Sequence, residues 1–426
     1  MNNANNPLLK SWIDVKNNSD FPIQNIPFGI FSPKGKSPRP ATIIGETVID
    51  LSVLAEEGFF DDIIDEEYDA FFASSLNDLI SLGKEFTAKL RNKISELFSY
   101  DNELIRDDSE LQSKLLFKQE DVEMHMPVEV GDYTDFYSSI EHATNVGTMF
   151  RDPDNALFPN WRHLPVGYHG RASSIVVSGT DIHRPNGQTL AAGEDKPVFG
   201  PCRLFDFELE MAFITGKGNK LGNPVKLEDA EDYIFGMVIF NDLSARDIQK
   251  WEYVPLGPFL AKNFGSVISP WIVTLDALEP FRVKGPKQEP EVLPYLKFDG
   301  NRNFDINLEV AIQPENGDET IVSKSNHKYL YWNIAQQLTH HTVNGCNIKP
   351  GDMYASGTIS GPTKDSFGSM LELSWGGKNP VSLKDGSERK FINDLDTIIM
   401  RGYAENNGVR VGFGKSVCKV LPAKKY

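Results

Sequence analysis

The chain has 426 residues, which is enough for more than one domain, and its apolar, aromatic and charged fractions are those of an ordinary soluble globular protein. Its formal net charge of −17, with no basic stripe to offset it, argues against nucleic acid or an anionic membrane surface as a partner. The three cysteines form no CxxC pair, and the sequence shows neither a basic and apolar leader nor an 18-residue apolar run, so we expect a cytoplasmic protein without disulfides, a thiolate zinc site or a membrane span.

The first part of the chain predicts a small unit of short strands and helices. Over residues 26–53, apolar runs alternate with turn residues, and Gly45 between two such runs indicates a hairpin. Over residues 82–97, apolar side chains recur three and four positions apart, as on one face of an amphipathic helix. A polar, acid-rich connector follows, and we therefore expect two units, residues 1–127 and 128–426.

Residues 204–213 alternate apolar and acidic side chains without a break, which is the period of a strand. Asp206, Glu208 and Glu210 would share one face, with neighbours roughly 7 Å apart, so two of these carboxylates could bind one ion. An edge strand with a solvated acidic face explains the same pattern, because charges discourage edge-to-edge pairing. Three like charges in a row repel one another, however, and a cation would remove that cost. Alternation alone leaves both interpretations open.

The rest of the second unit predicts mainly strands, with two helices. A nearly continuous apolar run over residues 233–240 is typical of a strand buried on both faces. A capping-box pattern at Ser244 and Asp247 predicts a short helix through Trp251. A longer helix is expected over residues 329–343, and final strands at residues 370–375, 396–400, 409–413 and 417–421.

Three further side chains, Asp242, His142 and Glu372, are candidates for a functional site. Asp242 ends the buried strand, where a carboxylate is costly unless it is paired or metal-bound. His142 follows an acidic and aromatic loop that contains Asp135. Glu372 stands alone in an apolar segment: it could face water, or beside a histidine it could hold the imidazole in the tautomer that a base requires. The candidate cation ligands are then Asp135, Glu208, Glu210 and Asp242. Such hard oxygen donors suit Ca²⁺, Mg²⁺ or Mn²⁺ better than zinc.

The second unit also contains distinctive segments at wide separations. They include residues 131–139 (GDYTDFYSS), 142–147 (HATNVG), 164–174 (LPVGYHGRASS), 208–213 (ELEMAF), 244–249 (SARDIQ), 251–259 (WEYVPLGPF), 337–341 (QLTHH), 355–361 (ASGTISG) and 367–375 (FGSMLELSW). At these segments the chain resembles the fumarylacetoacetate hydrolase family. The resemblance covers essentially all of the second unit, whereas the first 120 residues match more loosely.

The resemblance implies a mainly β (α+β) fold, with a small N-terminal SH3-like barrel followed by a larger mixed β-sandwich roll domain. It also implies a homodimer that binds Ca²⁺ and/or Mg²⁺ and acts on a small diketo acid. The metal ligands that it assigns are Asp135, Glu208, Glu210 and Asp242, with further cation contacts at Lys262 and Ser266. Ser266 stands where the family has threonine, and the hydroxyl is retained.

The implied reaction is hydrolysis of the carbon–carbon bond of 4-fumarylacetoacetate to fumarate and acetoacetate, the last step of tyrosine and phenylalanine degradation. The family's base and its orienting acid match His142 and Glu372. The groups around the developing negative charge match Arg246, Gln249 and Lys262. The substrate contacts match Tyr137, Arg151, Tyr168, Gln249, Tyr253 and Thr358. A dianionic substrate in an acidic protein would then meet local positive charge from the metal and these basic side chains.

Two other functions remain open from the sequence. A related metal-dependent decarboxylase, hydratase or acylpyruvate hydrolase could share the acidic cluster, although Tyr137, Arg151 and Tyr253 favour the named substrate. A metal-stabilised binding or scaffold protein would need no chemistry, although the presence of both His142 and Glu372 argues against it.

Overall fold

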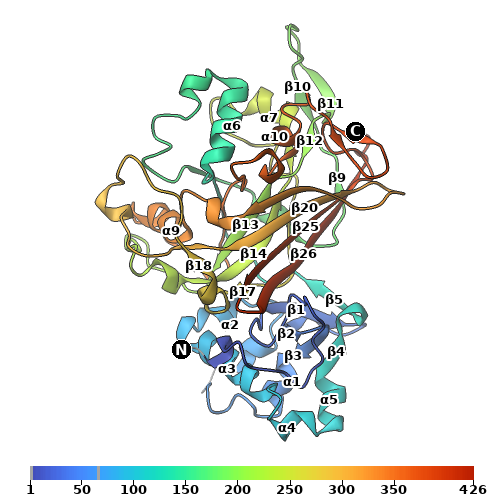
Figure 1. The fold of residues 1–426 in the computed structure, drawn as a ribbon, viewed down its shortest axis with the longest axis vertical. Helices are drawn as coiled ribbons and strands as arrows, with labels where there is room; N and C mark the ends of the chain where they lie inside the picture. Colours follow the sequence, from blue (N-terminus) through green and yellow to red (C-terminus); the bar gives the residue numbers. More distant parts are fainter. Residues whose placement is uncertain (1–2, 65–67) are drawn as a thin grey trace.

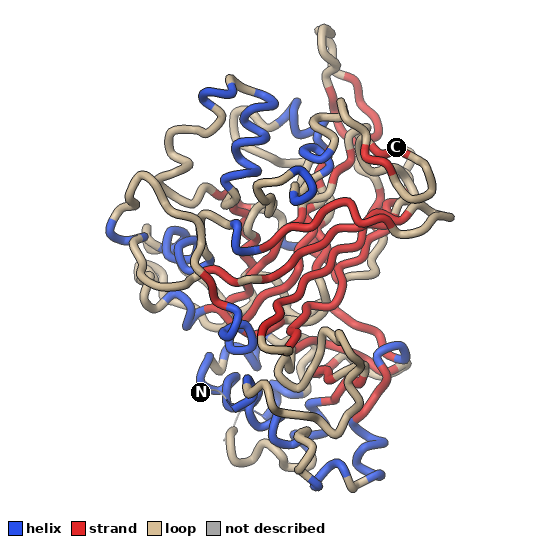
Figure 2. Tube along the Cα trace, in the orientation of Figure 1, coloured by secondary structure: helices blue, strands red, loops and turns tan. Residues whose placement is uncertain are grey.

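The computed structural model describes residues 3–64 and 68–426, which form a small N-terminal lobe and a larger β-rich body (Figure 1). Strands cross the middle of the body, and most helices lie around its edge and in the lobe (Figure 2). The prediction of a mainly β, α+β fold is confirmed. No helix within these residues combines the length and apolar character that crossing a bilayer requires.

The N-terminal lobe is built on a five-stranded antiparallel, barrel-like sheet in the order β4-β3-β2-β1-β5. Its strands are β1 (Phe28–Pro33), β2 (Arg39–Ile44), β3 (Thr47–Asp50), β4 (Leu116–Lys118) and β5 (Val122–His125). Its helices are α1 (Leu51–Glu56), α2 (Asn77–Ser81), α3 (Lys84–Leu97), α4 (Glu103–Arg106) and α5 (Ser109–Leu115). The predicted hairpin is confirmed, since Ile44 pairs with Thr47 across a two-residue turn in which Gly45 takes a φ of +61°.

The body contains two large sheets. The eight-stranded sheet has the order β7-β6-β22-β13-β14-β16-β8, with β17 paired to β14. Its strands are β6 (Tyr133–Phe136), β7 (Gly167–His169), β8 (Ile175–Val177), β13 (Leu209–Thr215), β14 (Ile234–Asp242), β16 (Ser266–Ile268), β17 (Val273–Thr274) and β22 (Met353–Ala355). The five-stranded sheet has the order β21-β20-β25-β26-β9, with β9 (Ile182–His183), β20 (Ile306–Gln313), β21 (Thr320–Asn326), β25 (Thr397–Asn406) and β26 (Val409–Leu421).

Helices and short strand pairs complete the body. The helices are α6 (Ile140–Phe150), α7 (Arg246–Glu252), α8 (Leu275–Leu278), α9 (Ile334–Thr342) and α10 (Met370–Leu373). The short pairs are β10 (Asn186–Thr189) with β11 (Val198–Pro201), β12 (Phe205–Asp206) with β15 (Ser244–Ala245), β18 (Arg282–Val283) with β19 (Asn303–Phe304), and β23 (Val381–Ser382) with β24 (Glu388–Arg389).

The two faces of the central strand pair β13–β14 have different coverings. Leu209, Met211 and Ile239 belong to the large core shared with the five-stranded sheet. On the opposite face, Ile214 and Phe240 belong to the core that continues into the N-terminal lobe. This second face carries acidic side chains where the strands end, because Glu210 and Asp242 alternate in phase with its apolar residues. The apolar surface thus anchors the strands that present the acids.

Several predicted elements are corrected. Residues 204–213 do not form one strand, since β12 ends at Asp206 and β13 begins at Leu209, with only an isolated bridge at Glu208 between them. Residues 370–375 begin with helix α10, because Ser369 and Asp206 accept hydrogen bonds from the helix's first N–H groups. The predicted strands over residues 409–413 and 417–421 are one strand, β26, in which Gly414 at φ +70° accommodates a bulge without ending the pairing.

The two predicted helices of the body are present with changed boundaries. Residues 329–343 contain α9 over a shorter span, opened by a capping box at Asn333 and Gln336. The helix near Trp251 is α7, but its N-cap is Ala245 and no side chain caps it. Asp247 instead accepts hydrogen bonds from the Cys202 thiol and the backbone N–H of Arg203.

Candidate active site

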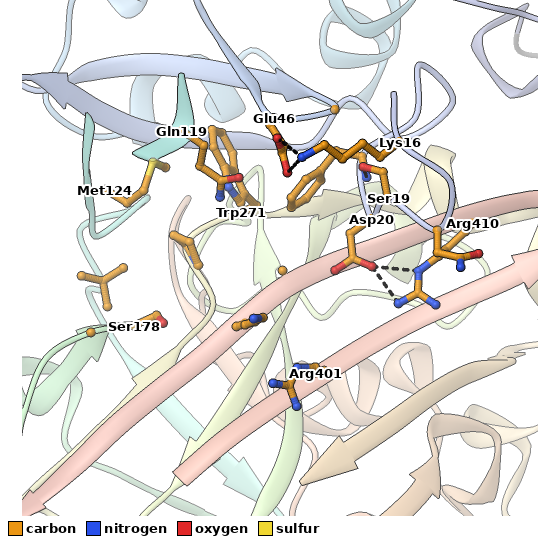
Figure 3. Close-up of a pocket in the computed structure, with 18 of the residues that line it drawn as sticks. Lys16, Ser19, Asp20, Glu46, Gln119, Met124, Ser178, Trp271, Arg401 and Arg410 are labelled. Atoms are coloured by element: carbon orange, nitrogen blue, oxygen red, sulfur yellow. Dashed lines mark hydrogen bonds and ion pairs between the residues drawn. The ribbon is translucent and has the colours of Figure 1, made fainter. Parts of the chain in front are cut away.

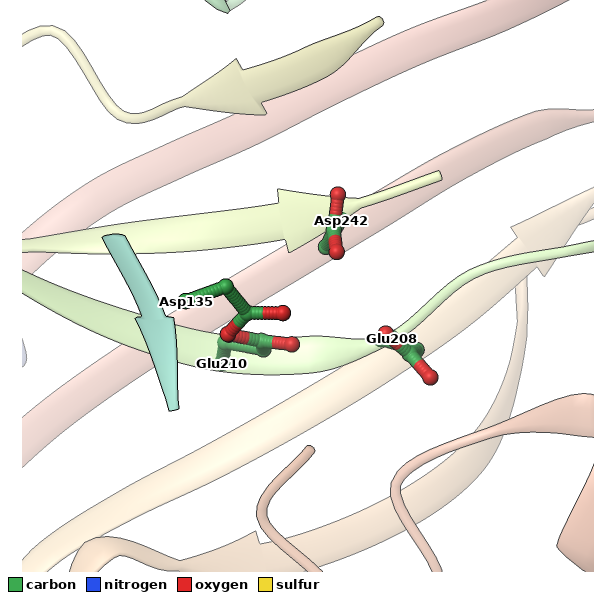
Figure 4. A group of neighbouring side chains, drawn as sticks. All are labelled: Asp135, Glu208, Glu210 and Asp242. Carbon is green, nitrogen blue, oxygen red and sulfur yellow. The ribbon is translucent and has the colours of Figure 1, made fainter. Parts of the chain in front are cut away.

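The four predicted metal ligands lie together in the body of the protein (Figure 4). Each contributes one carboxylate oxygen to a group in which all these atoms lie within 4.8 Å of one another, and all four residues are buried. Asp135 comes from β6, Glu210 from β13 and Asp242 from the end of β14, while Glu208 immediately precedes β13. We refer to Asp135, Glu208, Glu210 and Asp242 as the acidic cluster.

Strand register explains why distant segments meet here. Glu210 pairs with Phe240, so Asp242, two residues further along β14, projects from the same face. On the other side, Ala355 of β22 pairs with both Asp135 and Ala212. Because alanine side chains are small, they leave space above the sheet in which the carboxylates converge.

Two buried cations lie on one side of the acidic cluster. Lys262 Nζ donates to Glu208 and lies 2.5 Å from Asp242 Oδ2, while Arg246 Nη2 lies 2.8 Å from Glu208 Oε1. Ser266 Oγ donates to Asp242 Oδ1 at 2.9 Å. The structure therefore places the predicted cation contacts Lys262 and Ser266 directly beside Asp242.

The pKa values differ among the four carboxyls. Burial, reinforced by Glu208, raises the pKa of Asp242 although Lys262 opposes this. Burial, reinforced by neighbouring carboxylates, raises the pKa values of Asp135 and Glu210 well above their usual range. Burial also opposes ionisation of Glu208, but Arg246 and Lys262 outweigh it and lower the pKa of that carboxyl. Negative charge is therefore compensated at Glu208 and uncompensated at Asp135 and Glu210.

The residues present fit a divalent cation. Asp135 Oδ1 and Glu210 Oε1 are buried and accept no hydrogen bond from any residue that the structure describes. The hydroxyls of Tyr133 and Tyr168, which share the face of Asp135, are buried and likewise have no partner in the described residues. Buried polar atoms are rarely left without a partner. A bound cation and its oxygen ligands would supply the interactions that these carboxylate and hydroxyl groups lack.

The predicted base and its orienting acid form a buried pair. His142, near the start of α6, has Nδ1 2.7 Å from Glu372 Oε2. Burial opposes ionisation of Glu372, but His142 and the surrounding hydrogen bonds lower its pKa, so this carboxyl stays ionised. Glu372 lies in α10, and Ser369 at its N-cap pairs in a β-bridge with Glu208. The pair is thus joined to the acidic cluster through one residue.

The predicted substrate contacts are only partly gathered. Tyr137 packs edge-on against the His142 ring with centroids 5.2 Å apart, and Tyr168 pairs with Asp135 across β6 and β7. Gln249 Oε1 accepts from Arg246, and the buried Thr358 hydroxyl has no partner among the described residues.

Arg151 and Tyr253 form no hydrogen bond or ion pair with the acidic cluster among the described residues. Arg151 stacks on Phe158 at 4.2 Å from its ring centroid. Tyr253 follows α7 and is 51% exposed. Its backbone N–H donates to the Gln249 carbonyl at the end of that helix, but no side-chain hydrogen bond, ion pair or ring contact joins it to the other candidates in the described part of the chain.

Some side chains that shape the site were not predicted from the sequence. Asn145, Ser360 and Ser369 donate to the Glu372 carboxylate at 2.8–2.9 Å. Asn145 stands three residues after His142, a helical spacing that places both side chains on one face and could have revealed it. The serines carry no comparable signal, since serine in a loop is usually turn chemistry.

A cavity also lies away from the acidic cluster. A hollow of about 900 Å³ lies between residues of the N-terminal lobe, such as Lys16 and Glu46, and residues of the body, such as Trp271 and Arg410 (Figure 3). Charged side chains that line it form ion pairs with one another: Lys16 with Glu46, and Arg410 with Asp20. None of the acidic cluster's residues lines it.

Comparisons with known proteins agree along the whole chain. The family model described as fumarylacetoacetate (FAA) hydrolase C-terminal matches residues 133–402, and the model described as fumarylacetoacetase N-terminal matches residues 24–127. The chain is 53% identical over 415 residues to the fumarylacetoacetase of Homo sapiens, covering 97% of this chain and 99% of that protein. It is 54% identical over 424 residues to the fumarylacetoacetase of Dictyostelium discoideum, covering 98% and 99%.

A solved structure shares the fold at much lower sequence identity. The fumarylacetoacetate hydrolase of Exiguobacterium antarcticum aligns with a TM-score of 0.53 at 17% identity, covering 94% of this chain and all of that one.

Proposed function

The chain belongs to the fumarylacetoacetate hydrolase family, and we infer that it hydrolyses fumarylacetoacetate to fumarate and acetoacetate in tyrosine degradation. The observation that carries this inference is the His142–Glu372 pair beside a buried acidic cluster, in a chain about half identical to curated fumarylacetoacetases over nearly its full length. The enzyme is a hydrolase that acts on a carbon–carbon bond.

His142 is the proposed general base. Its Nδ1–H donates to the ionised Glu372, which leaves the lone pair of Nε2 free to take a proton from water. The hydroxide adds to the carbonyl carbon, and the electron pair of the breaking carbon–carbon bond leaves with the acetoacetate carbon. That carbon then receives the proton held by His142, so water and substrate are fully accounted for. A placed base typically contributes about 10²–10⁴-fold to the rate.

Arg246, Gln249 and Lys262 are proposed to stabilise the negative charge that develops on the substrate oxygens. Arg246 and Lys262 are buried cations, and burial of such donors strengthens their effect on a nearby oxyanion. Burial opposes the charge on Lys262, but Asp242 and Glu208 outweigh it and raise the lysine's pKa, so the side chain remains an ammonium group. Loss of one such donor commonly costs about 10²–10³-fold in rate.

The acidic cluster would hold the cation, and we propose Ca²⁺ or Mg²⁺ because all four donors are hard oxygens. When bound, the ion would act as a Lewis acid that polarises the diketone oxygens. Lys262 and Ser266 would support it through Asp242, which both contact. The raised pKa values of Asp135 and Glu210 support this proposal, since a cation would supply the positive charge that these two carboxylates lack.

Substrate binding is proposed at Tyr137, Arg151, Tyr168, Gln249, Tyr253 and Thr358. The unpartnered hydroxyls of Tyr168 and Thr358 and the guanidinium of Arg151 suit a dianion with two keto groups. Because Tyr253 is half exposed and Arg151 stacks on Phe158, we propose that their segments close over the substrate when it binds.

We further propose a cytoplasmic homodimer with units 1–127 and 128–426. Three free cysteines support a reducing compartment. Exposed apolar side chains after α7 and on the β10–β11 hairpin support a self-association surface, among them Val198, Phe199, Val254, Leu256 and Phe259. Analytical ultracentrifugation tests the dimer, and a concentration-independent monomer would contradict it.

The experiment that tests the reaction follows the near-ultraviolet absorbance of fumarylacetoacetate and identifies both products. Acylpyruvates and related diketo acids in the same assay separate the proposed substrate from those of the alternative enzymes. We expect turnover to be greatest with fumarylacetoacetate. Faster turnover of an acylpyruvate, or no turnover of any substrate with Mg²⁺ or Ca²⁺, would contradict the proposal.

A further inference from the structure

Asp206 is the third acid of the alternating segment, and it does not belong to the acidic cluster. Its carboxylate is fully buried and makes four hydrogen bonds. Oδ1 accepts from the backbone N–H groups of Phe207 and Met370 at 2.8 and 2.7 Å. Oδ2 accepts from the N–H of Leu371 at 3.0 Å and from Arg246 Nε at 2.8 Å. These contacts occupy the carboxylate's ordinary acceptor capacity and leave none for a metal ion.

On one side, Asp206 holds the helix that carries Glu372. Met370 and Leu371 are the first two residues of α10, and their N–H groups have no carbonyl partner within the helix. Asp206 accepts both, while the N-cap Ser369 accepts the N–H of Glu372 itself. The position of Glu372, and of the His142 ring that it orients, therefore depends on Asp206.

On the other side, Asp206 fixes the guanidinium of Arg246. The Nε atom is bound to Asp206, and the same planar group reaches Glu208 through Nη2 and Gln249 through Nη1. With Nε fixed, the two terminal nitrogens face the acidic cluster and the proposed oxyanion site. A lysine could not replace this arrangement, because it lacks the planar fork that spans two carboxylates.

We propose that Asp206 is a positioning residue for the hydrolysis: its carboxylate fixes α10, and with it the His142–Glu372 pair, relative to Arg246 at the acidic cluster. This role rests on the function proposed above, in which Glu372 orients the base and Arg246 stabilises the oxyanion. In the addition of water, the base acts on the attacking water and the oxyanion donor acts on the substrate oxygen. The distance between these two groups must therefore be held within a fraction of an ångström.

Asp206→Asn tests the proposal, because it keeps the shape of the side chain but replaces one acceptor with an N–H donor. We expect kcat to fall about 10²-fold, the loss typical of a misplacement of about 1 Å. KM should stay within about threefold, since Asp206 does not touch substrate. The dissociation constant for Mg²⁺, measured by calorimetry without substrate, should also stay within about threefold, whereas Glu210→Gln should lose tight binding.

A double-mutant cycle separates positioning from general destabilisation. If Asp206 acts largely through Glu372, the total loss of kcat in the double variant Asp206→Asn, Glu372→Gln should be far smaller than the product of the two single losses. Asp396→Asn is the matched control, because Asp396 is a buried aspartate that also pairs with an arginine and accepts a backbone N–H, but it lies outside the site. It should lower the melting temperature and leave kcat unchanged.

Asp206→Glu keeps the charge and shifts the carboxylate by one methylene, so it should show an intermediate loss of kcat with the same non-additivity. It supplies the test if Asp206→Asn does not fold. Wild-type kcat in a folded Asp206 variant, loss of Mg²⁺ binding equal to that of Glu210→Gln, additive effects in the cycle, or an equal kcat loss in Asp396→Asn would each overturn the positioning role while wild-type hydrolysis stands. Wild-type protein that does not hydrolyse fumarylacetoacetate would overturn the proposed function and this role together.

Discussion

Each carboxylate of the acidic cluster has its own electrostatic neighbourhood. Glu208 contacts both Arg246 and Lys262, and its pKa is lowered. Asp135 and Glu210 contact neither cation, and their pKa values are raised by burial and by neighbouring carboxylates, Asp242 and Glu208 among them. Without a metal, the cluster therefore favours protons at Asp135 and Glu210. Cation binding must displace these protons.

This competition predicts a pH dependence of cation binding. Because the pKa values of Asp135 and Glu210 are raised in the folded protein, the metal-free protein binds more protons folded than unfolded. These two groups therefore make the folded protein less stable as the pH rises through their raised pKa values. A divalent cation reverses the effect. We expect the increase in melting temperature produced by excess Mg²⁺ to grow between about pH 5 and pH 8. An increase that is constant or shrinks over this range would contradict the assignment.

His142 is expected to act in catalysis without contributing to cation binding. His142→Ala should lower kcat by about 10²–10⁴-fold, because water loses its proton acceptor. The Mg²⁺ dissociation constant should change little, since the imidazole is not one of the cluster's ligands. Calorimetry and steady-state kinetics on the same preparation measure both quantities. Near-normal kcat would exclude His142 as the base.

The individual site residues differ in how far the sequence could reveal them. Alternation placed Glu208 and Glu210 on one face, but it could not tell Asp206 from them, although Asp206 binds Arg246 and α10. Asp135 comes from a segment more than 70 residues away, so no local pattern could show that it reaches the cluster. The partners of Glu372 depend on how α6, α10 and the loop at Ser360 pack, which no local pattern encodes.

Among the elements, the loop that leaves β22 has a direct effect on the acidic cluster. Gly357 donates its backbone N–H to Glu210 Oε2 at 2.9 Å. It adopts a φ of +75°, and a Cβ there would lie 2.3 Å from the carbonyl oxygen of Phe136. This glycine is thus required both by backbone conformation and by space, next to a cluster ligand.

Gly357→Ala is expected to destabilise the protein and to weaken cation binding, because relief of the clash must move the loop away from Glu210. A positive φ alone costs about 1–3 kcal/mol for a non-glycine residue. Gly386→Ala is the control, since Gly386 also has a positive φ but its Cβ would meet no heavy atom within 4 Å. Thermal melts and Mg²⁺ titrations should show that both variants lose stability and that only Gly357→Ala loses affinity. Equal Mg²⁺ affinities would contradict the role of the loop.

The sequence predicts helices and strands best where hydrophobic periodicity is strong and contacts with distant residues do not decide the local structure. The buried strand over residues 233–240 and the amphipathic helix over residues 82–97 appear as β14 and α3 with shifts of a few residues. The apolar residues of α10 fit a strand as well as a helix, so the sequence predicts a strand there. The hydrogen bonds that decide for the helix involve Asp206, more than 160 positions away.

At the scale of the whole molecule, the N-terminal lobe covers the sheet face that carries the acidic cluster. Phe28 exchanges two backbone hydrogen bonds with Ile272 at 3.0 and 2.8 Å, which joins the lobe to the body. Side chains from both parts form one continuous core, including Ile26, Phe28, Ile214, Phe240 and Ile272. Phe240 is the cross-strand partner of Glu210, so this core reaches the floor of the site.

Removal of residues 1–127 is therefore expected to unfold or aggregate the remainder, since it exposes the apolar face of β13 and β14. Size-exclusion chromatography and circular dichroism of the fragment 128–426, with the full chain as control, measure this effect. Co-expression of the two fragments should restore soluble protein. A monodisperse fragment that melts at the wild-type temperature and binds Mg²⁺ normally would show that the lobe is not needed for the site.

The central claim is that the acidic cluster holds a divalent cation on which hydrolysis of fumarylacetoacetate depends. The most direct measurement is the absorbance decay of this substrate with chelator-stripped enzyme, followed by titration with Mg²⁺ or Ca²⁺, for the wild type and for Glu210→Gln. We predict that stripped wild-type enzyme is inactive and recovers with added cation, whereas Glu210→Gln stays inactive at concentrations that saturate the wild type. Undiminished turnover of the stripped enzyme, or full recovery of Glu210→Gln at those concentrations, would contradict the account.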